Sequence, residues 1–133
     1  MVKNTMDETK KGFMQNIGDL SFKKIDETNY EFSIKVEEKF LNTGKIAHGG
    51  FIATIADTGM GNAAHMAAGN KRSVTVNLDI KYISAGKLGD NLVGKVEVLK
   101  RTKTLVFINC KILNSNGIIA VSYTHLTLPT NHP

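Results

Sequence analysis

Residues 48–70 read HGGFIATIADTGMGNAAHMAAGN, and the architecture of the domain follows from this stretch. From Phe51 to Ala68 the apolar residues recur at helical spacing among Ala and Met, which favour helices. The pair Gly49–Gly50 precedes this run, and Gly69–Asn70 follows it as a typical helix stop. We therefore predict one long helix here, the only long helix that the sequence supports.

Strands are predicted on both sides of this helix. Before it, Asn29–Glu37 alternates strictly between apolar and polar residues, as a half-buried strand does, and Leu20–Asp26 is a weaker strand. After it, three strands are predicted at Ser73–Ile83, Asn91–Lys100 and Lys103–Leu113, the last of them mid-sheet or at an interface, and a hairpin at Ser115–Gly117 leads into a final strand from Ile118. In the first of these three, alternation places on one face Val74, Val76, Leu78, Ile80 and Tyr82. With a short helix over Thr5–Ile17, the fold class is α+β, one antiparallel sheet packed over one long helix.

Composition bounds the function classes. The 133 residues suffice for a single domain, and one Cys excludes an internal disulfide framework and a Cys-rich zinc site. The net charge is +5, and residues 41–133 hold ten of the 17 basic residues but four of the 12 acidic ones. This excess indicates an anionic partner or a solvated Lys-rich surface.

Several partners and locations are not expected. Aromatic residues are not interleaved with Arg, and we therefore expect no nucleic-acid partner. No apolar run reaches the roughly 18 residues of a membrane-spanning helix, and no secretory signal opens the chain. We expect a cytoplasmic protein without membrane insertion. No spacing of His, Cys, Asp or Glu matches a metal motif, and no metal or cofactor is expected.

The residues before the helix could carry chemistry. Asn42 to Gly50 leads directly into it, and backbone N–H groups at a helix N-terminus lack intrahelical acceptors and carry partial positive charge. Two glycines let another molecule approach this backbone, which could bind an anion or stabilise a carbonyl oxygen that becomes negative. A turn that merely needs glycine is the alternative. His48 could donate a hydrogen bond, order the turn or act as a base, and spacing does not choose.

Asp57 is the one acid between Glu38 and Asp79, inside an otherwise apolar helix. It is either a solvent-facing carboxylate or the base that accompanies an oxyanion site at the helix start. We expect a surface role for His65 and a buried, unreactive thiol for Cys110.

These residues form a recognisable set. Asn42, His48-Gly49-Gly50 and Asp57 lie on and before an Ala-rich helix, followed by Val74–Leu78, by Tyr82–Asp90 and by Lys103–Leu105. The ordered set resembles the hotdog-fold acyl-CoA thioesterases, closest to the phenylacetate-degradation type and the thioesterase superfamily member 2 type. The resemblance implies a sheet wrapped around the central helix, a homodimer that often pairs into a homotetramer, and active sites between protomers.

The resemblance also implies roles for individual residues. Asn42, His48 and Gly49 of one chain would face Asp57 and Thr75 of its neighbour. The Gly49 N–H would polarise the thioester carbonyl, while Asn42 and His48 hold the hydrogen-bond network. Asp57 would be general base or nucleophile, and Thr75, where many relatives carry Ser, would help to position water.

By the same resemblance, coenzyme A is expected at Gly50 and on two further segments, Tyr82–Lys87 and Lys100–Leu105. It would bind there as part of the substrate and not as a cofactor. Its contacts would be Gly50, Tyr82, Ser84, Ala85, Lys87, Lys100, Arg101, Lys103 and Thr104. Lys and Arg suit its phosphates, and a solvated surface remains the alternative for each. A non-catalytic acyl-CoA-binding protein and a hotdog hydratase or dehydratase are the competing functions.

The end of the chain departs from the resemblance. Residues 121–133 do not read like the family's closing strand, and they resemble a translated sequencing-adaptor tail, although the composition of Tyr123–Leu128 suits a strand. We expect one domain over residues 1–133 with a core of about 20–122, and whether 123–133 is a non-native tail stays open.

Overall fold

The fold is seen in a computed structural model, which describes residues 12–128. Within these residues the chain forms one long helix, six strands and two short 3₁₀ helices. The helices are η1 (Gly12–Asn16), η2 (Glu38–Phe40) and α2 (Gly49–Ala67), and the strands are β1 (Ser21–Lys24), β2 (Asn29–Lys35), β3 (Val74–Tyr82), β4 (Asn91–Arg101), β5 (Leu105–Asn114) and β6 (Gly117–Thr127). The long helix and all six strands lie within a few residues of their predicted positions.

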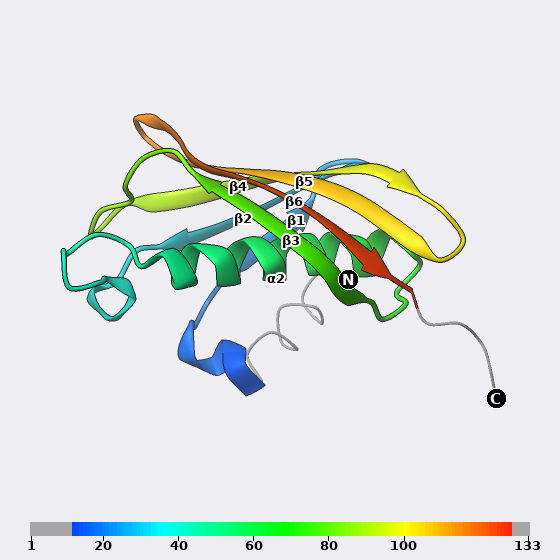
Figure 1. The fold of residues 1–133 in the computed structure, drawn as a ribbon, viewed down its shortest axis with the longest axis horizontal. Coiled ribbons are helices and arrows are strands. Elements are labelled where there is room, and N and C mark those ends of the chain that lie inside the picture. The colour runs from blue at the N-terminus through cyan, green and yellow to red at the C-terminus, as the bar shows by residue number, and fades with distance from the viewer. Residues whose placement is uncertain (1–11, 129–133) are drawn as a thin grey trace.

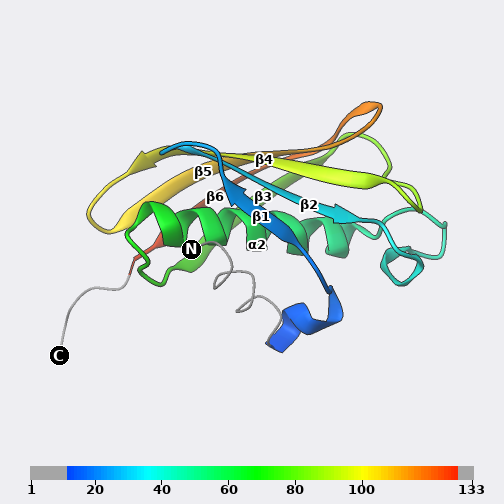
Figure 2. The same ribbon diagram turned by 180° about the vertical axis from the view of Figure 1, so that it is seen from behind.

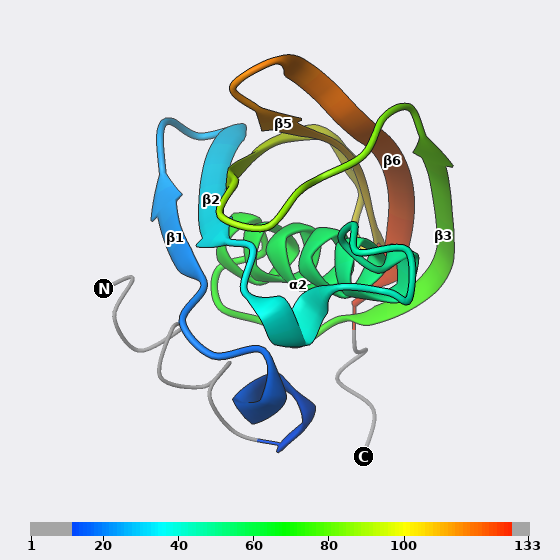
Figure 3. The same cartoon turned by 90° about the vertical axis from the view of Figure 1, so that its left-hand side faces the viewer.

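The strands form one antiparallel sheet in the order β1-β2-β4-β5-β6-β3. Strand β5 lies inside the sheet, as its apolar sequence predicted, while β1 and β3 are the edges. The sheet curls around α2, which lies along its concave side, as the end-on view of Figure 3 shows. Figures 1 and 2 show the same two layers from opposite sides. The predicted α+β arrangement is confirmed.

The core lies between the sheet and α2. Alternation in β2 buries Tyr30, Phe32 and Ile34, and Ile55 and Met60 of α2 have no exposed surface. The helix begins at the predicted glycines and ends before Gly69 and Asn70, both of which adopt positive φ. The buried residues of α2 extend from Phe51 to Ala64, so the helix packs against the sheet along most of its length.

The ring of Phe32 lies between two glycines of different elements. Gly59 belongs to α2, and Gly94 is the register partner of Phe32 on β4. A Cβ atom at either glycine would overlap the Phe32 ring. The absence of both side chains therefore lets α2 approach the sheet closely.

One prediction about β3 is wrong. The register of β3 against β6 shifts between Thr75 and Asn77, which leaves Val76 as the extra residue of a bulge. Val74 and Val76 are 68% and 55% exposed, whereas Leu78 packs against the core. The five apolar residues therefore do not share one face, because the bulge reverses the alternation and turns Thr75 inward.

The two ends of the chain differ from expectation in part. Of the predicted helix Thr5–Ile17, residues 5–11 lie outside the described residues, and residues 12–16 form a 3₁₀ helix. Its Met14 is buried and accepts a 3.3 Å hydrogen bond from Thr58 of α2. At the other end, β6 continues to Thr127 and pairs with β3 and β5. The strand that the composition of Tyr123–Leu128 suited is therefore present up to Thr127.

Candidate functional site

The loop before α2 is ordered by Asn42. Its Oδ1 atom accepts hydrogen bonds from the N–H groups of Gly44 (2.8 Å) and Ile46 (3.2 Å), so the side chain replaces backbone acceptors within the turn. The tip residue Lys45 adopts a left-handed conformation, φ 64°. Since Oδ1 is engaged in the loop, the Nδ2 group of Asn42 is the part of the amide left to donate elsewhere.

His48 caps the N-terminus of α2. Its Nδ1 atom accepts a 2.8 Å hydrogen bond from the Gly50 N–H, and its backbone N–H donates to Phe40. Because Nδ1 is an acceptor, the proton of the neutral ring lies on Nε2. The geometry therefore decides among the three roles that the sequence left open: His48 orders the turn and can donate from Nε2, but its basic nitrogen is occupied.

Gly49 and Gly50 differ in what they can offer a ligand. Gly49 is the first residue of α2, and its N–H has no acceptor inside the helix. The Gly50 N–H is taken by His48, and a Cβ at Gly50 would lie 3.0 Å from that Nδ1 atom. A Cβ at Gly49 would meet the Tyr82 hydroxyl at 3.4 Å, an ordinary contact. The fold thus needs glycine at 50 to seat His48, whereas glycine at 49 leaves an open N–H.

Asp57 and Thr75 are brought together across the helix–sheet interface. The Thr75 hydroxyl donates a 2.8 Å hydrogen bond to Oδ1 of Asp57, and both side chains are half-buried. The bulge at Val76 makes this contact possible, because it places Thr75 on the inner face of β3. The alternative of a solvent-facing Asp57 therefore does not describe the structure.

An open hollow of about 340 Å³ lies at the N-terminus of α2. It collects five of the predicted site residues, and its remaining lining is apolar apart from Gly86. The lining residues are Asn42, Gly49, Tyr82, Ser84 and Ala85, with Ile46, Ala47, Ile52, Ile83, Gly86 and Ile119. Sequence reasoning missed the second group, because nothing in an isolated apolar residue distinguishes a cavity wall from a core position.

Lys87 lies beside this hollow. It forms an isolated bridge with Ile46, and its backbone N–H donates to Oδ2 of Asp90 at 2.9 Å. Asn114 donates to the same carboxylate oxygen at 3.1 Å. Asp90 therefore holds the loop that carries Ser84, Ala85 and Lys87, a role that the sequence did not assign to it.

Two pairs of predicted site elements are kept apart within one chain. Asp57 lies about 12 Å along the axis of α2 from Gly49, at roughly 1.5 Å per residue. The segment Lys100–Thr104 comprises the last two residues of β4 and the turn after it, about 33 Å from the loop that precedes this strand. Figure 1 shows these two loops at opposite ends of the sheet. A single chain therefore cannot place Gly49 and Asp57, or both cationic segments, on the same small group.

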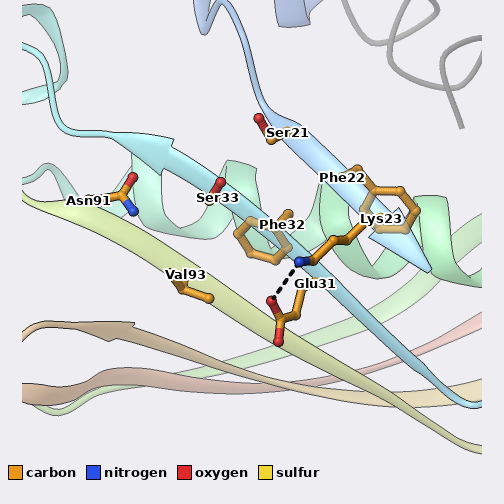
Figure 4. Close-up of a pocket in the computed structure, with 8 residues that line it drawn as sticks. All are labelled: Ser21, Phe22, Lys23, Glu31, Phe32, Ser33, Asn91 and Val93. Atoms are coloured by element: carbon orange, nitrogen blue, oxygen red, sulfur yellow. Dashed lines mark ion pairs between the residues drawn. The ribbon is translucent and has the colours of Figure 1, made fainter. Parts of the chain in front are cut away.

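Other candidates lie outside this region. Burial raises the pKa of the Cys110 thiol to about 12, and the side chain is 1% exposed, as predicted for a structural thiol. His65 contacts the Lys71 carbonyl at 3.0 Å near the end of α2. A second hollow on the convex face of the sheet contains Lys23 and Glu31, whose charged groups lie 4.0 Å apart (Figure 4). It holds none of the predicted site residues.

Residues 12–128 contain neither a candidate metal-binding cluster nor a candidate transmembrane helix. No group of three or more His, Cys, Asp or Glu in this part of the chain could hold a metal ion. None of its helices has the length and apolar character needed to cross a membrane.

Comparison with known proteins places the chain in a family. The sequence pattern of the thioesterase superfamily matches residues 44–121, more than half of the chain. The chain belongs to the thioesterase superfamily. The match covers Gly49, Asp57, Thr75 and the whole hollow except Asn42.

Individual members of this family are similar to the chain. Human acyl-coenzyme A thioesterase 13 is 36% identical over 81 residues, which are 61% of this chain and 58% of the relative's length. The chain thus spans somewhat more than half of that relative. The solved structure of zebrafish thioesterase superfamily member 2 is 27% identical and superposes with a TM-score of 0.88 over 96% of each chain. The PaaI protein of Escherichia coli shares the fold at 18% identity, TM-score 0.84, over 97% of this chain and 93% of its own. The hotdog fold predicted from the sequence is confirmed.

Proposed function

We propose that this protein is an acyl-CoA thioesterase, which hydrolyses an acyl- or aryl-CoA to the free acid and CoA. One observation carries the proposal: the open N–H of Gly49 lines a hollow together with Asn42, Tyr82 and the loop after β3. The name of the human relative, acyl-coenzyme A thioesterase 13, supports the choice of substrate class.

The proposed reaction uses groups of the protein and water. The Gly49 N–H, aided by the dipole of α2, donates to the thioester oxygen as negative charge develops there. In the general-base route, Asp57 takes a proton from water, the water oxygen bonds to the carbonyl carbon, and the C–S bond breaks to release the thiol of CoA. In the nucleophile route, an Asp57 oxygen bonds to the carbonyl carbon and the C–S bond breaks, which releases CoA as its thiolate. Water then hydrolyses the mixed anhydride to the free acid and the Asp57 carboxylate, and the proton that this step releases goes to the thiolate. In both routes the Thr75 hydroxyl orients the carboxylate or the water.

A homodimer would complete this site. Gly49 and Asp57 are about 12 Å apart along α2, and we propose that Gly49 of one copy works with Asp57 of a second copy. The outer edge of β3 supports this arrangement, because β3 pairs only with β6 among the described strands and exposes Val74 and Val76 there. Two such dimers would form the expected tetramer. The molar mass measured by light scattering distinguishes a monomer, a dimer and a tetramer.

Coenzyme A would bind across the two copies. Ser84, Ala85 and Lys87 lie at one end of β4, and the cations Lys100, Arg101 and Lys103 lie at the other, about 33 Å away. We propose that the phosphates of one CoA contact two segments from different copies. One copy supplies the loop with Lys87, and the other supplies Lys100, Arg101, Lys103 and Thr104. Gly50 would take part through the order of the turn, because its N–H is engaged by His48. CoA esters are also consistent with the cytoplasmic location expected from the sequence.

The test compares Asp57→Asn with wild type on a panel of fatty-acyl- and aryl-CoA esters, measured as release of free thiol. Loss of a general base or nucleophile lowers kcat by about 10²–10⁴-fold. Asp79→Asn is the matched control, because Asp79 is exposed on β3 and its nearest cation is Lys81 at 3.3 Å. Equal rates for the Asp57 variant and wild type would contradict the mechanism. Saturable binding of esters without release would instead identify a binding protein, and hydration of an enoyl-CoA would identify a hydratase.

A further inference from the structure

Tyr82 makes a contact that its expected role in CoA binding does not require. It is the last residue of β3, and its hydroxyl donates a 2.8 Å hydrogen bond to the Gly49 carbonyl oxygen. The contact joins residues 33 positions apart in the sequence. The side chain is 56% exposed and lines the hollow at the start of α2. The strand end is thereby tied to the first residue of the helix.

The peptide group between Gly49 and Gly50 is held at both of its polar atoms. Its oxygen accepts from Tyr82, and its N–H donates to Nδ1 of His48, each at 2.8 Å. Hydrogen bonds linked through one peptide group polarise and strengthen each other. The tyrosine hydroxyl therefore supports the bond that fixes the His48 ring, and it limits rotation of the peptide plane next to the Gly49 N–H.

The same strand holds the other half of the candidate site in a similar way. Thr75 donates to Asp57 at 2.8 Å, and Tyr82 donates to Gly49 at 2.8 Å. Two different hydroxyls of β3 thus contact the two α2 residues to which the proposed function gives a chemical role: that of Thr75 contacts Asp57, and that of Tyr82 contacts Gly49. Both contacts run from the edge strand β3 to α2, and both are made within a single copy of the chain.

From this geometry we infer that Tyr82 is a positioning residue, whose hydroxyl orients the Gly49 N–H and the Nε2–H tautomer of His48 for thioester hydrolysis. The inference rests on the proposed function. A residue that positions a donor aimed at the transition state affects kcat more than KM, whereas a residue that contacts CoA in the bound substrate raises KM.

The first experiment measures kcat and KM of Tyr82→Phe on the CoA ester that wild type hydrolyses best. We expect kcat to fall about five- to tenfold with KM within twofold of wild type, in keeping with the loss of one neutral hydrogen bond. Tyr123→Phe is the control. Tyr123 alternates along β6 with the buried Ser122 and Thr124, so its side chain lies on the convex face, and we expect its loss of a hydroxyl to leave both constants unchanged. A rise in KM with unchanged kcat would overturn the inference and favour a CoA contact.

The second experiment needs no turnover. In ¹⁵N-labelled protein, the Nδ1 resonance of His48 and the exchange rate of the Gly50 amide report the capping bond directly. We expect faster exchange at Gly50 and a shifted His48 resonance in Tyr82→Phe, and wild-type values in Tyr123→Phe. Unchanged signals in Tyr82→Phe would overturn the inference. If wild type released no thiol, the proposed function would fail, whereas the capping signals would still decide whether Tyr82 holds His48.

Discussion

Two glycines of α2, Gly59 and Gly61, should respond in opposite ways to the same substitution. A Cβ at Gly59 would overlap the Phe32 ring, whereas a Cβ at Gly61 meets nothing within 4 Å. Neither glycine has a positive φ. Replacing either by Ala therefore has the same effect on the helix backbone, and the two variants differ in the space around the added methyl group.

The expected sizes follow from this difference. Ala in place of Gly inside a helix raises the free energy of unfolding by about 1 kcal/mol, and we expect Gly61→Ala to gain roughly 0.5–1 kcal/mol. At Gly59 the overlap opposes this gain. Overpacking costs about 1–3 kcal/mol or more, and the buried Phe32 ring cannot move toward β4 because it already lies against Gly94. We expect Gly59→Ala to lose about 2 kcal/mol net, which lowers Tm by about 7 °C for a chain of this size, against a rise of about 3 °C for Gly61→Ala.

Urea denaturation followed by circular dichroism measures both variants against wild type at one protein concentration. The midpoint should fall for Gly59→Ala and rise for Gly61→Ala at a similar slope. If Gly59→Ala were as stable as Gly61→Ala, the close contact between Phe32 and the helix would be refuted as the reason for glycine at 59.

Three further predictions concern the site and the buried thiol. Thr75→Val removes the hydroxyl that contacts Asp57 and should lower kcat about tenfold, whereas Thr75→Ser should keep most of it; equal loss in both would point to packing instead. Gly49→Ala should fold with a wild-type melting curve, because its Cβ fits beside Tyr82, yet lose at least about tenfold in kcat as the methyl group covers the open N–H; a fully active variant would argue against that donor. Burial raises the pKa of Cys110 from 9.0 to about 12, and folding therefore favours the protonated thiol. The free energy of folding that this raised pKa of Cys110 contributes is fully present below pH 9 and is lost as pH rises toward 12. The fall of the urea midpoint between pH 9 and 11 should be shallower in Cys110→Ala, and an equal slope in both proteins would contradict this.

Local patterns were sufficient for the elements of the fold. Strict alternation from Tyr30 to Ile34 implied a strand with one buried face, and Gly69 with Asn70 marked the end of the long helix. Both inferences depend on neighbours within a few residues, where side-chain period and backbone preference act directly. The ordered set of Asn42, His48, Gly49 and Asp57 also pointed to the family from sequence alone.

Contacts between distant segments were decided by the tertiary structure. The bulge at Val76 has no signal in an alternating sequence, because it arises in the pairing with β6, and it changes the face on which Thr75 lies so that Thr75 contacts Asp57. The bond from Tyr82 to Gly49 is likewise a matter of where the end of β3 meets the start of α2.

The sequence by itself thus determined the elements of the fold, the family, and the elements on which the proposed site residues stand. The tertiary structure decided which of them meet. It places Tyr82 against Gly49 and Thr75 against Asp57, and it holds these two pairs apart because a rigid helix separates Gly49 from Asp57 by about 12 Å.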